Sequence, residues 1–84
     1  MRVLFFTASW CSACKGSRPT VIKACKDAGA DYMEVNLDED DSLGIKYQVC
    51  GLPTVIIEKN NEEFARREGA ITRQDLISLI RGAD

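Results

Sequence analysis

The sequence predicts an α/β fold, a mixed four-stranded β-sheet flanked by three helices in the order β-α-β-α-β-β-α. Short apolar runs of strand length alternate with segments whose apolar residues recur at helical spacing. The first three elements allow a right-handed parallel βαβ unit, and the third and fourth strand segments lie close enough in sequence for an antiparallel hairpin. Because the 84 residues contain no linker or repeat, we expect a single domain over residues 1–84.

The first strand is expected at Arg2–Thr7, which is rich in β-branched and aromatic residues and too short for a helix. A long helix is expected from Ser12 to about Ala28, with Gly29 as its C-cap. Its inward face is predicted by small and apolar residues at helical spacing, namely Ala13, Val21, Ala24, Cys25 and Ala28.

A second strand is expected at Tyr32–Leu37, where polar and apolar residues alternate. The acidic run Asp38–Asp41 suits the start of a short helix that continues to about Tyr47, because carboxylates are favoured at the positive end of the helix dipole.

The last three elements are a hairpin and a helix. A third strand is expected at Pro53–Glu58 and a fourth at Glu62–Arg67, joined by a tight turn at Asn60-Asn61. The segment Thr72–Asp75 resembles a capping box that opens an amphipathic helix. The residues that this helix is expected to bury are Leu76, Ile77, Leu79 and Ile80.

Composition limits the partners that this chain can recognise. The net charge is −2 with 29% charged residues, so no basic patch is expected for nucleic acid or an anionic membrane. No apolar stretch approaches the ~20 residues of a membrane span, and the apolar start Val3–Phe6 is too short for a signal-peptide core. We therefore expect a cytoplasmic monomer whose partners are proteins.

Cys11 and Cys14 stand at the predicted junction between the first strand and the long helix. At a helix N-terminus, unpaired N–H groups and the dipole stabilise a thiolate, which makes Cys11 a nucleophile. Cys14 follows about one turn later, so its sulfur can reach Cys11 and close a small disulfide ring. The pair predicts thiol–disulfide exchange in which Cys11 attacks and Cys14 resolves.

A zinc site is the alternative for these cysteines, because Cys25 and Cys50 would complete a set of four thiolates. Its spacing is unfavourable, since Cys25 and Cys50 are isolated and the chain has no histidine. We expect no metal, although a non-enzymatic metal-binding or docking module stays open as a second class of function. Cys25 is expected to be a small core residue, and Cys50 is either a modifiable thiol or a plain surface residue.

On these motifs the chain resembles the thioredoxin superfamily. The resemblance depends on the segments Ala8–Lys15, Gly51–Thr54 and Gly69-Ala70, and on Pro19. It covers nearly the whole chain but lacks the extra N-terminal strand and helix of full-length thioredoxins. The implied architecture is a minimal thioredoxin-like fold of glutaredoxin size.

The resemblance also implies a docking surface. The peptide bond before Pro53 would be cis and lie beside the sulfurs, with the backbone of Leu52 free to pair with an extended substrate segment. The flat apolar rim around the sulfurs would consist of Trp10, Gly51, Leu52, Gly69 and Ala70.

Three departures from the family pattern stand out. The dipeptide Ser12-Ala13 replaces the Gly-Pro of thioredoxins and the Pro-Tyr of glutaredoxins, so the redox potential cannot be transferred. Phe5 stands where thioredoxins carry a buried aspartate beneath the second cysteine. Glu34 stands at the position where thioredoxins carry a lysine that partners this aspartate. One hypothesis is that a half-buried Glu34 takes over proton transfer; the other is an exposed strand carboxylate without such a role.

The resemblance implies a protein-disulfide reductase that needs no bound cofactor. Reducing equivalents would come from NADPH through a flavoprotein of the thioredoxin reductase type, or from glutathione. The pair Trp10-Cys11 favours the thioredoxin type, and a glutaredoxin-type, glutathione-dependent reductase is the alternative. An oxidant or isomerase is a third possibility within the redox class.

Overall fold

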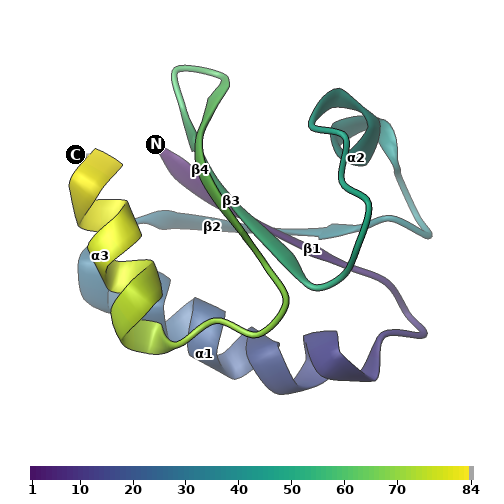
Figure 1. Ribbon diagram of the computed structural model, residues 1–84, viewed down its shortest axis with the longest axis horizontal. Coiled ribbons are helices and arrows are strands. Elements are labelled where there is room, and N and C mark those ends of the chain that lie inside the picture. Colours follow the sequence, from purple (N-terminus) through teal and green to yellow (C-terminus); the bar gives the residue numbers. More distant parts are fainter. Residues whose placement is uncertain (84) are drawn as a thin grey trace.

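The computed structural model describes residues 1–83 and contains a mixed four-stranded sheet in the order β2-β1-β3-β4 (Figure 1). β1 pairs in parallel with β2 and antiparallel with β3, which pairs antiparallel with β4. The predicted fold class is confirmed. The strands are β1 Arg2–Thr7, β2 Asp31–Asn36, β3 Thr54–Lys59 and β4 Glu62–Glu68, and the helices are α1 Ser12–Ala28, α2 Ser42–Lys46 and α3 Arg73–Ala83.

Alternation along β1 divides the interior into two cores. Val3 and Phe5 belong to the larger core, which also contains buried residues of α1 and α3. Leu4 and Phe6 point to the other face and pack in a smaller core with Tyr47, directly after α2. Figure 1 shows the same arrangement, with α1 and α3 on one face of the sheet and α2 on the other. A central strand buried on both faces explains why β1 is almost wholly apolar.

The region between β2 and α2 differs from the sequence prediction. β2 lies one residue earlier than Tyr32–Leu37, and α2 begins at Ser42 instead of within the acidic run. The N–H groups of Glu39 and Asp40 both donate to the carbonyl of Asn36, at 3.0 and 3.1 Å. The Asn36 Oδ1 also accepts a hydrogen bond from the N–H of Asp38 at 2.9 Å. The acidic residues therefore form a turn, because this side-chain acceptor offers their backbone an alternative to the helix.

The hairpin and α3 follow the predicted pattern with small shifts. β3 begins at Thr54 because Pro53 has no N–H for a strand ladder. Asn60 and Asn61 adopt left-handed φ values of 55° and 64°, which suit a two-residue hairpin turn. β4 extends one residue further than predicted, to Glu68. The Thr72 Oγ1 accepts a hydrogen bond from the N–H of Asp75 at 3.1 Å and so caps α3.

In α1 the predicted inward face is largely correct. Val21, Ala24 and Cys25 are buried, and Gly29 ends the helix at a φ of 70°. Ala13 is exposed instead, because the adjacent Cys14 takes the inward position in the first turn.

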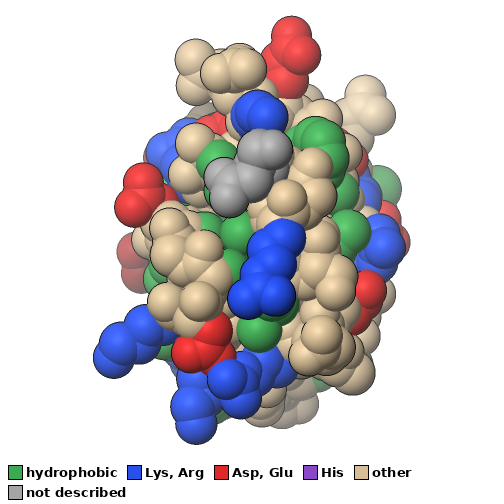
Figure 2. All heavy atoms as spheres, turned by 90° about the vertical axis from the view of Figure 1, so that its left-hand side faces the viewer, with side chains coloured by type: hydrophobic (Ala, Val, Ile, Leu, Met, Phe, Trp, Pro, Cys, Tyr) green, Lys and Arg blue, Asp and Glu red, His purple; other side chains and the backbone are tan. Residues whose placement is uncertain are grey.

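The surface carries charges of both signs. Figure 2, which views the side of the molecule where α3 lies, shows basic and acidic side chains intermixed. No helix within residues 1–83 has the length and apolar character that a membrane span requires.

Candidate functional site

Three loops meet at one edge of the sheet. Since β3 runs antiparallel to both β1 and β4, the carboxyl ends of β1 and β4 lie at the same edge as the start of β3. Phe6 pairs with Thr54, and the N–H of Gly69 donates to the carbonyl of Pro53 at 2.8 Å. Residues far apart in sequence, at about positions 8–11, 50–53 and 69–70, are thereby brought together.

Cys11 and Cys14 form a disulfide at this edge, with their Cα atoms 5.3 Å apart. Cys11 is the N-cap of α1, and its Sγ accepts a hydrogen bond from the N–H of Cys14 at 3.1 Å. The N–H of Cys11 in turn donates to the carbonyl of Ala8 at 3.1 Å. A donor aimed at Cys11 Sγ, together with the positive end of the helix dipole, stabilises a thiolate at this position once the disulfide opens.

The two sulfurs differ in access. Cys11 retains 5% exposure, whereas Cys14 has none. Cys14 Sγ lies 4.0 Å from the carbonyl oxygen of Phe6, beneath the surface. Trp10, directly before Cys11, is 73% exposed. A group that approaches from outside therefore meets Cys11 beside an exposed indole ring.

The other predicted rim residues lie on loops at the same edge of the sheet and are buried to different degrees. The Leu52–Pro53 peptide bond is cis, as the resemblance implied. Gly51 and Ala70 are exposed, Leu52 and Gly69 are partly buried, and Pro53 is buried. Pro53 therefore does not form part of the exposed surface. Within residues 1–83, neither backbone group of Leu52 takes part in a backbone hydrogen bond.

Glu34 lies on β2 beside Phe5 of β1. Glu34 is an exposed residue of β2, with 31% of its side-chain surface accessible, which agrees with the exposed strand carboxylate and not with the half-buried one. Arg18 of α1 binds both carboxylate oxygens, at 2.7 and 3.0 Å, and the Tyr32 hydroxyl donates at 2.9 Å. The hydrogen bond from Arg18 is the main reason that the pKa of Glu34 is lowered. The geometry gives Glu34 an ion-pair partner, which favours the alternative without a role in proton transfer.

The two remaining cysteines lie apart from the disulfide. Cys25 is buried on α1, and burial raises the pKa of its thiol to about 11. Cys50 is exposed on the loop before Gly51, with its Sγ 3.5 Å from the carbonyl oxygen of Gln48. In the part of the chain that the structure describes, no three His, Cys, Asp or Glu side chains gather to hold a metal ion.

Sequence reasoning missed a contact that holds the Trp10 loop. Asp38 Oδ2 accepts a hydrogen bond from the N–H of Ser9 at 2.9 Å, and the Asn36 amide reaches the Ser9 hydroxyl at 3.5 Å. The sequence pattern instead predicts that Asp38 begins a helix. A usable signal was present, because the carboxyl ends of parallel strands lie at the same sheet edge, so the residues after β2 must approach those after β1.

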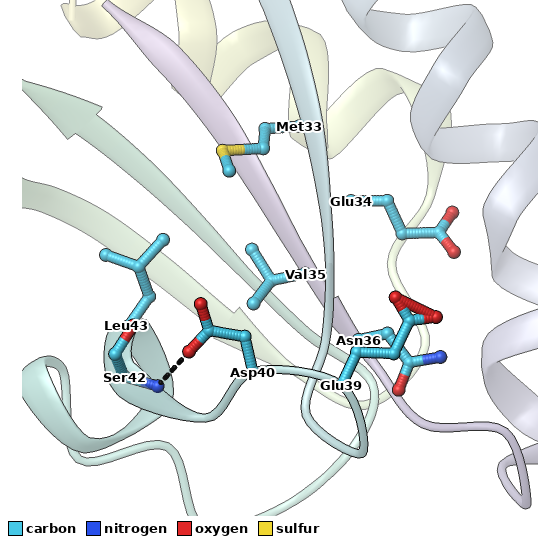
Figure 3. Close-up of a pocket in the computed structure, with 8 residues that line it drawn as sticks. All are labelled: Met33, Glu34, Val35, Asn36, Glu39, Asp40, Ser42 and Leu43. Carbon is cyan, nitrogen blue, oxygen red and sulfur yellow. Dashed lines mark hydrogen bonds between the residues drawn. The ribbon is translucent and has the colours of Figure 1, made fainter.

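A shallow pocket of about 150 Å³ lies between β2 and α2, away from the disulfide (Figure 3). Met33 and Val35 point toward this side of β2, whereas Glu34 points the opposite way. The residues that line it are Met33, Glu34, Val35, Asn36, Glu39, Asp40, Ser42 and Leu43. Neither active-site cysteine candidate contributes to it, so this pocket is separate from the site.

Comparison with known proteins identifies the family. The thioredoxin family model matches residues 1–82. This chain belongs to the thioredoxin family. It is 38% identical to thioredoxin 2 of Plasmodium falciparum over 81 residues, which cover 94% of this chain and 52% of that protein. Thioredoxin of Mycoplasma genitalium is 30% identical over 79 residues, covering 93% of this chain and 78% of the relative. The chain thus spans about half the length of the Plasmodium thioredoxins that it matches.

Solved thioredoxin structures agree with this assignment. A thioredoxin-2 described as a component of malaria parasite protein secretion machinery superimposes with a TM-score of 0.85 at 38% identity, covering 95% of this chain and 80% of that chain. Thioredoxin 1 from Thermosipho africanus also gives a TM-score of 0.85, at 26% identity and with 98% and 92% coverage. The resemblance to the thioredoxin superfamily and the minimal thioredoxin-like fold are both confirmed.

Proposed function

We propose that this thioredoxin-family chain is a thiol–disulfide oxidoreductase that reduces protein disulfides. The observation that carries the proposal is the placement of Cys11, which caps α1, accepts the N–H of Cys14 and is the only one of the bonded sulfur pair with any exposure. This environment favours a reactive thiolate at the surface and a protected partner one turn below it.

In the proposed cycle the Cys11 thiolate attacks one sulfur of a substrate disulfide. A bond forms between Cys11 and that sulfur, the substrate S–S bond breaks, and the other substrate sulfur leaves as a thiolate that takes a proton from water. The Cys14 thiolate then attacks Cys11 Sγ, which restores the Cys11–Cys14 disulfide and releases the second substrate sulfur. Two electrons pass from the cysteine pair to the substrate.

Substrate binding is assigned to the rim around Cys11. The backbone N–H and carbonyl of Leu52 have no backbone partner within residues 1–83 and are suited to pair with an extended segment on either side of a substrate disulfide. Trp10, Gly51, Gly69 and Ala70 would contact the same segment. Their burial pattern, with Trp10 73% exposed and Gly51 and Ala70 also exposed, supports a surface that docks proteins and not an enclosed small-molecule pocket.

The oxidised pair must be reduced again after each cycle. We propose an NADPH-linked flavoprotein of the thioredoxin reductase type as the electron donor, supported by the thioredoxin-like Trp10-Cys11 pair and by the named relatives. Glutathione is the alternative donor. Turnover of a small mixed disulfide with reduced glutathione and glutathione reductase would assign the glutaredoxin type, whereas turnover only with the flavoprotein would assign the thioredoxin type.

The first test is a redox titration. The protein is equilibrated in dithiothreitol or glutathione buffers of graded potential, free thiols are blocked, and the pairing is determined by mass spectrometry. A reversible Cys11–Cys14 disulfide with a midpoint of roughly −200 to −270 mV is expected for a general reductant. If these cysteines pair at no potential and the purified protein contains zinc, the exchange mechanism is wrong and a structural cysteine module takes its place.

A further inference from the structure

The hydroxyl of Thr7 stands out among the polar groups of the interior. Thr7 is 1% exposed. Among the buried side-chain nitrogen and oxygen atoms of residues 1–83, only Thr7 Oγ1 lacks a hydrogen-bond partner. On folding, this hydroxyl loses its hydrogen bonds to water and forms none within the protein, which lowers the stability of the folded state. Such a group requires an explanation. One explanation is that its hydrogen-bond partner becomes available only in another state of the protein.

Thr7 is the last residue of β1, and its side chain lies on the side of the sheet that α1 and α3 cover. Alternation along the strand gives Thr7 the same face as Val3 and Phe5, whose core also includes Cys11 and Cys14. The adjacent carbonyl of Phe6 lies 4.0 Å from Cys14 Sγ. Figure 1 shows the first turns of α1 beneath this end of β1. Alternation therefore directs the Thr7 side chain toward the helix turn that carries the disulfide.

The surroundings of Cys14 otherwise favour its neutral thiol. Its side chain is fully buried, and the Phe6 carbonyl is an acceptor, which suits S–H and not a thiolate. Phe5, on the same face as Thr7, contributes only apolar surface. A resolving thiolate at Cys14 needs a donor, and Thr7 is a free donor at this place.

We propose that the Thr7 hydroxyl donates a hydrogen bond to the Cys14 sulfur when the disulfide is reduced, and so acts as the positioning residue for the resolving thiolate. The proposal rests on the exchange function described above. A sulfur in a disulfide is a weak acceptor, whereas a thiolate is a strong one, so the bond is available mainly after reduction. Thr7 is thus unsatisfied in the oxidised protein and satisfied in the reduced protein.

This difference makes Thr7 part of the redox equilibrium. Replacing the hydroxyl by a methyl group in Thr7→Val removes an unpaired group from the oxidised form and a hydrogen bond from the reduced form. Both effects make the disulfide harder to reduce. We expect the Cys11–Cys14 equilibrium constant to change about tenfold, which corresponds to a midpoint about 30 mV more negative for a two-electron couple.

The rate of resolution supplies a second measurement. Loss of the donor lowers the thiolate fraction of Cys14 about tenfold, but a thiolate of higher pKa is the better nucleophile by about threefold, so the net rate should fall about threefold. The experiment forms a mixed disulfide between Cys11 and a chromogenic thiol and follows release of that thiol by stopped flow. Thr7→Ser retains a hydroxyl and is expected to restore both the rate and the midpoint.

Thermal unfolding of both redox forms completes the test. Thr7→Val should raise the unfolding midpoint of the oxidised form and leave unchanged or lower that of the reduced form. Equal increases in both forms, or an unchanged potential and rate, would overturn the proposal. If Thr7→Val does not fold, Thr7→Ala and Thr7→Ser give the same comparison. A wild-type chain that shows no reversible Cys11–Cys14 pairing would instead refute the exchange function itself.

Discussion

The hydroxyl of Tyr47 donates a hydrogen bond to Glu58, a carboxylate that is only 4% exposed on β3. The second partner of Glu58 is Arg2, whose guanidinium lies 2.5 Å from the other carboxylate oxygen. Arg66 of β4 donates to the carbonyl of Tyr47 from the other side. These contacts attach the end of α2 to the sheet, and α2 leads directly into the loop that carries Leu52 and Pro53.

Removing the Tyr47 hydroxyl should destabilise the fold. In Tyr47→Phe the buried carboxylate of Glu58 keeps Arg2 but loses its other donor, and a charged buried acceptor without its full set of bonds costs about 1–3 kcal/mol. Urea unfolding of the oxidised protein measures this change in the free energy of unfolding. Tyr32→Phe is a suitable comparison, because the Tyr32 hydroxyl bonds the more exposed Glu34 and its loss should cost less. Equal losses in the two variants would contradict the importance of burial.

Glu58 should also contribute to acid sensitivity. The hydrogen bond from Arg2 is the main cause of its lowered pKa. A carboxylate with a lower pKa in the folded state stabilises the protein above its unfolded pKa, and this stability is lost as the pH falls through the folded pKa. We expect the free energy of unfolding to decline less steeply in Glu58→Gln than in the wild type from about pH 5 downward. Denaturant titrations at several pH values test this, and parallel curves would contradict it.

For Glu34 the geometry predicts an ion-pair role. Because Arg18 lowers its pKa, the carboxylate is a weak proton acceptor at neutral pH. Glu34→Gln is therefore expected to leave the pH profile of disulfide exchange unchanged and to cost at most about 1 kcal/mol, the value of a partly exposed ion pair. The profile is measured with a model disulfide under single turnover. A displaced profile would establish Glu34 as the proton acceptor instead.

Replacing Cys11 and replacing Cys14 should block disulfide exchange at different steps. Cys14→Ser retains Cys11, the more accessible cysteine of the pair, but cannot resolve, so it should accumulate a mixed disulfide between Cys11 and substrate. Cys11→Ser should form no such adduct, because Cys14 is fully buried. Intact-mass spectrometry under non-reducing conditions distinguishes these outcomes. An adduct on Cys14 in the Cys11→Ser protein would reverse the assigned roles.

Asp38 is expected to affect stability and substrate docking, because it binds the backbone of the loop that carries Ser9 and Trp10. Asp38→Ala removes the acceptor of the Ser9 N–H beside Trp10, and should lower stability by about 1 kcal/mol and weaken substrate docking. Asp41→Ala is a matched control in the same acidic run, since Asp41 makes no side-chain capping bond. The KM for a protein disulfide should rise in Asp38→Ala only. A similar increase in both variants would mean that general charge, and not the Ser9 contact, is responsible.

Much of this structure follows from local patterns. The apolar run of β1 and the spacing along α1 predicted those elements with correct bounds, and Asn60-Asn61 predicted the hairpin turn. The predicted start of α2 was wrong, because the Asn36 side-chain oxygen accepts the N–H of Asp38 and the acidic run forms a turn before the helix begins at Ser42. Helix-dipole preferences describe an average surface helix and do not include such a competing acceptor.

For this protein the sequence by itself determined the order of strands and helices, the position of Cys11 at a helix N-terminus and the reach of Cys14, since these depend on residues within a few positions of each other. Only the tertiary structure decided that Arg18 meets Glu34, that Asp38 binds the Ser9 backbone and that Thr7 is left without a partner. Contacts of this kind depend on strand register and on how α1 lies across the sheet. A side chain's residue type specifies which bonds it can make, and the packing of distant segments decides which of those bonds are made.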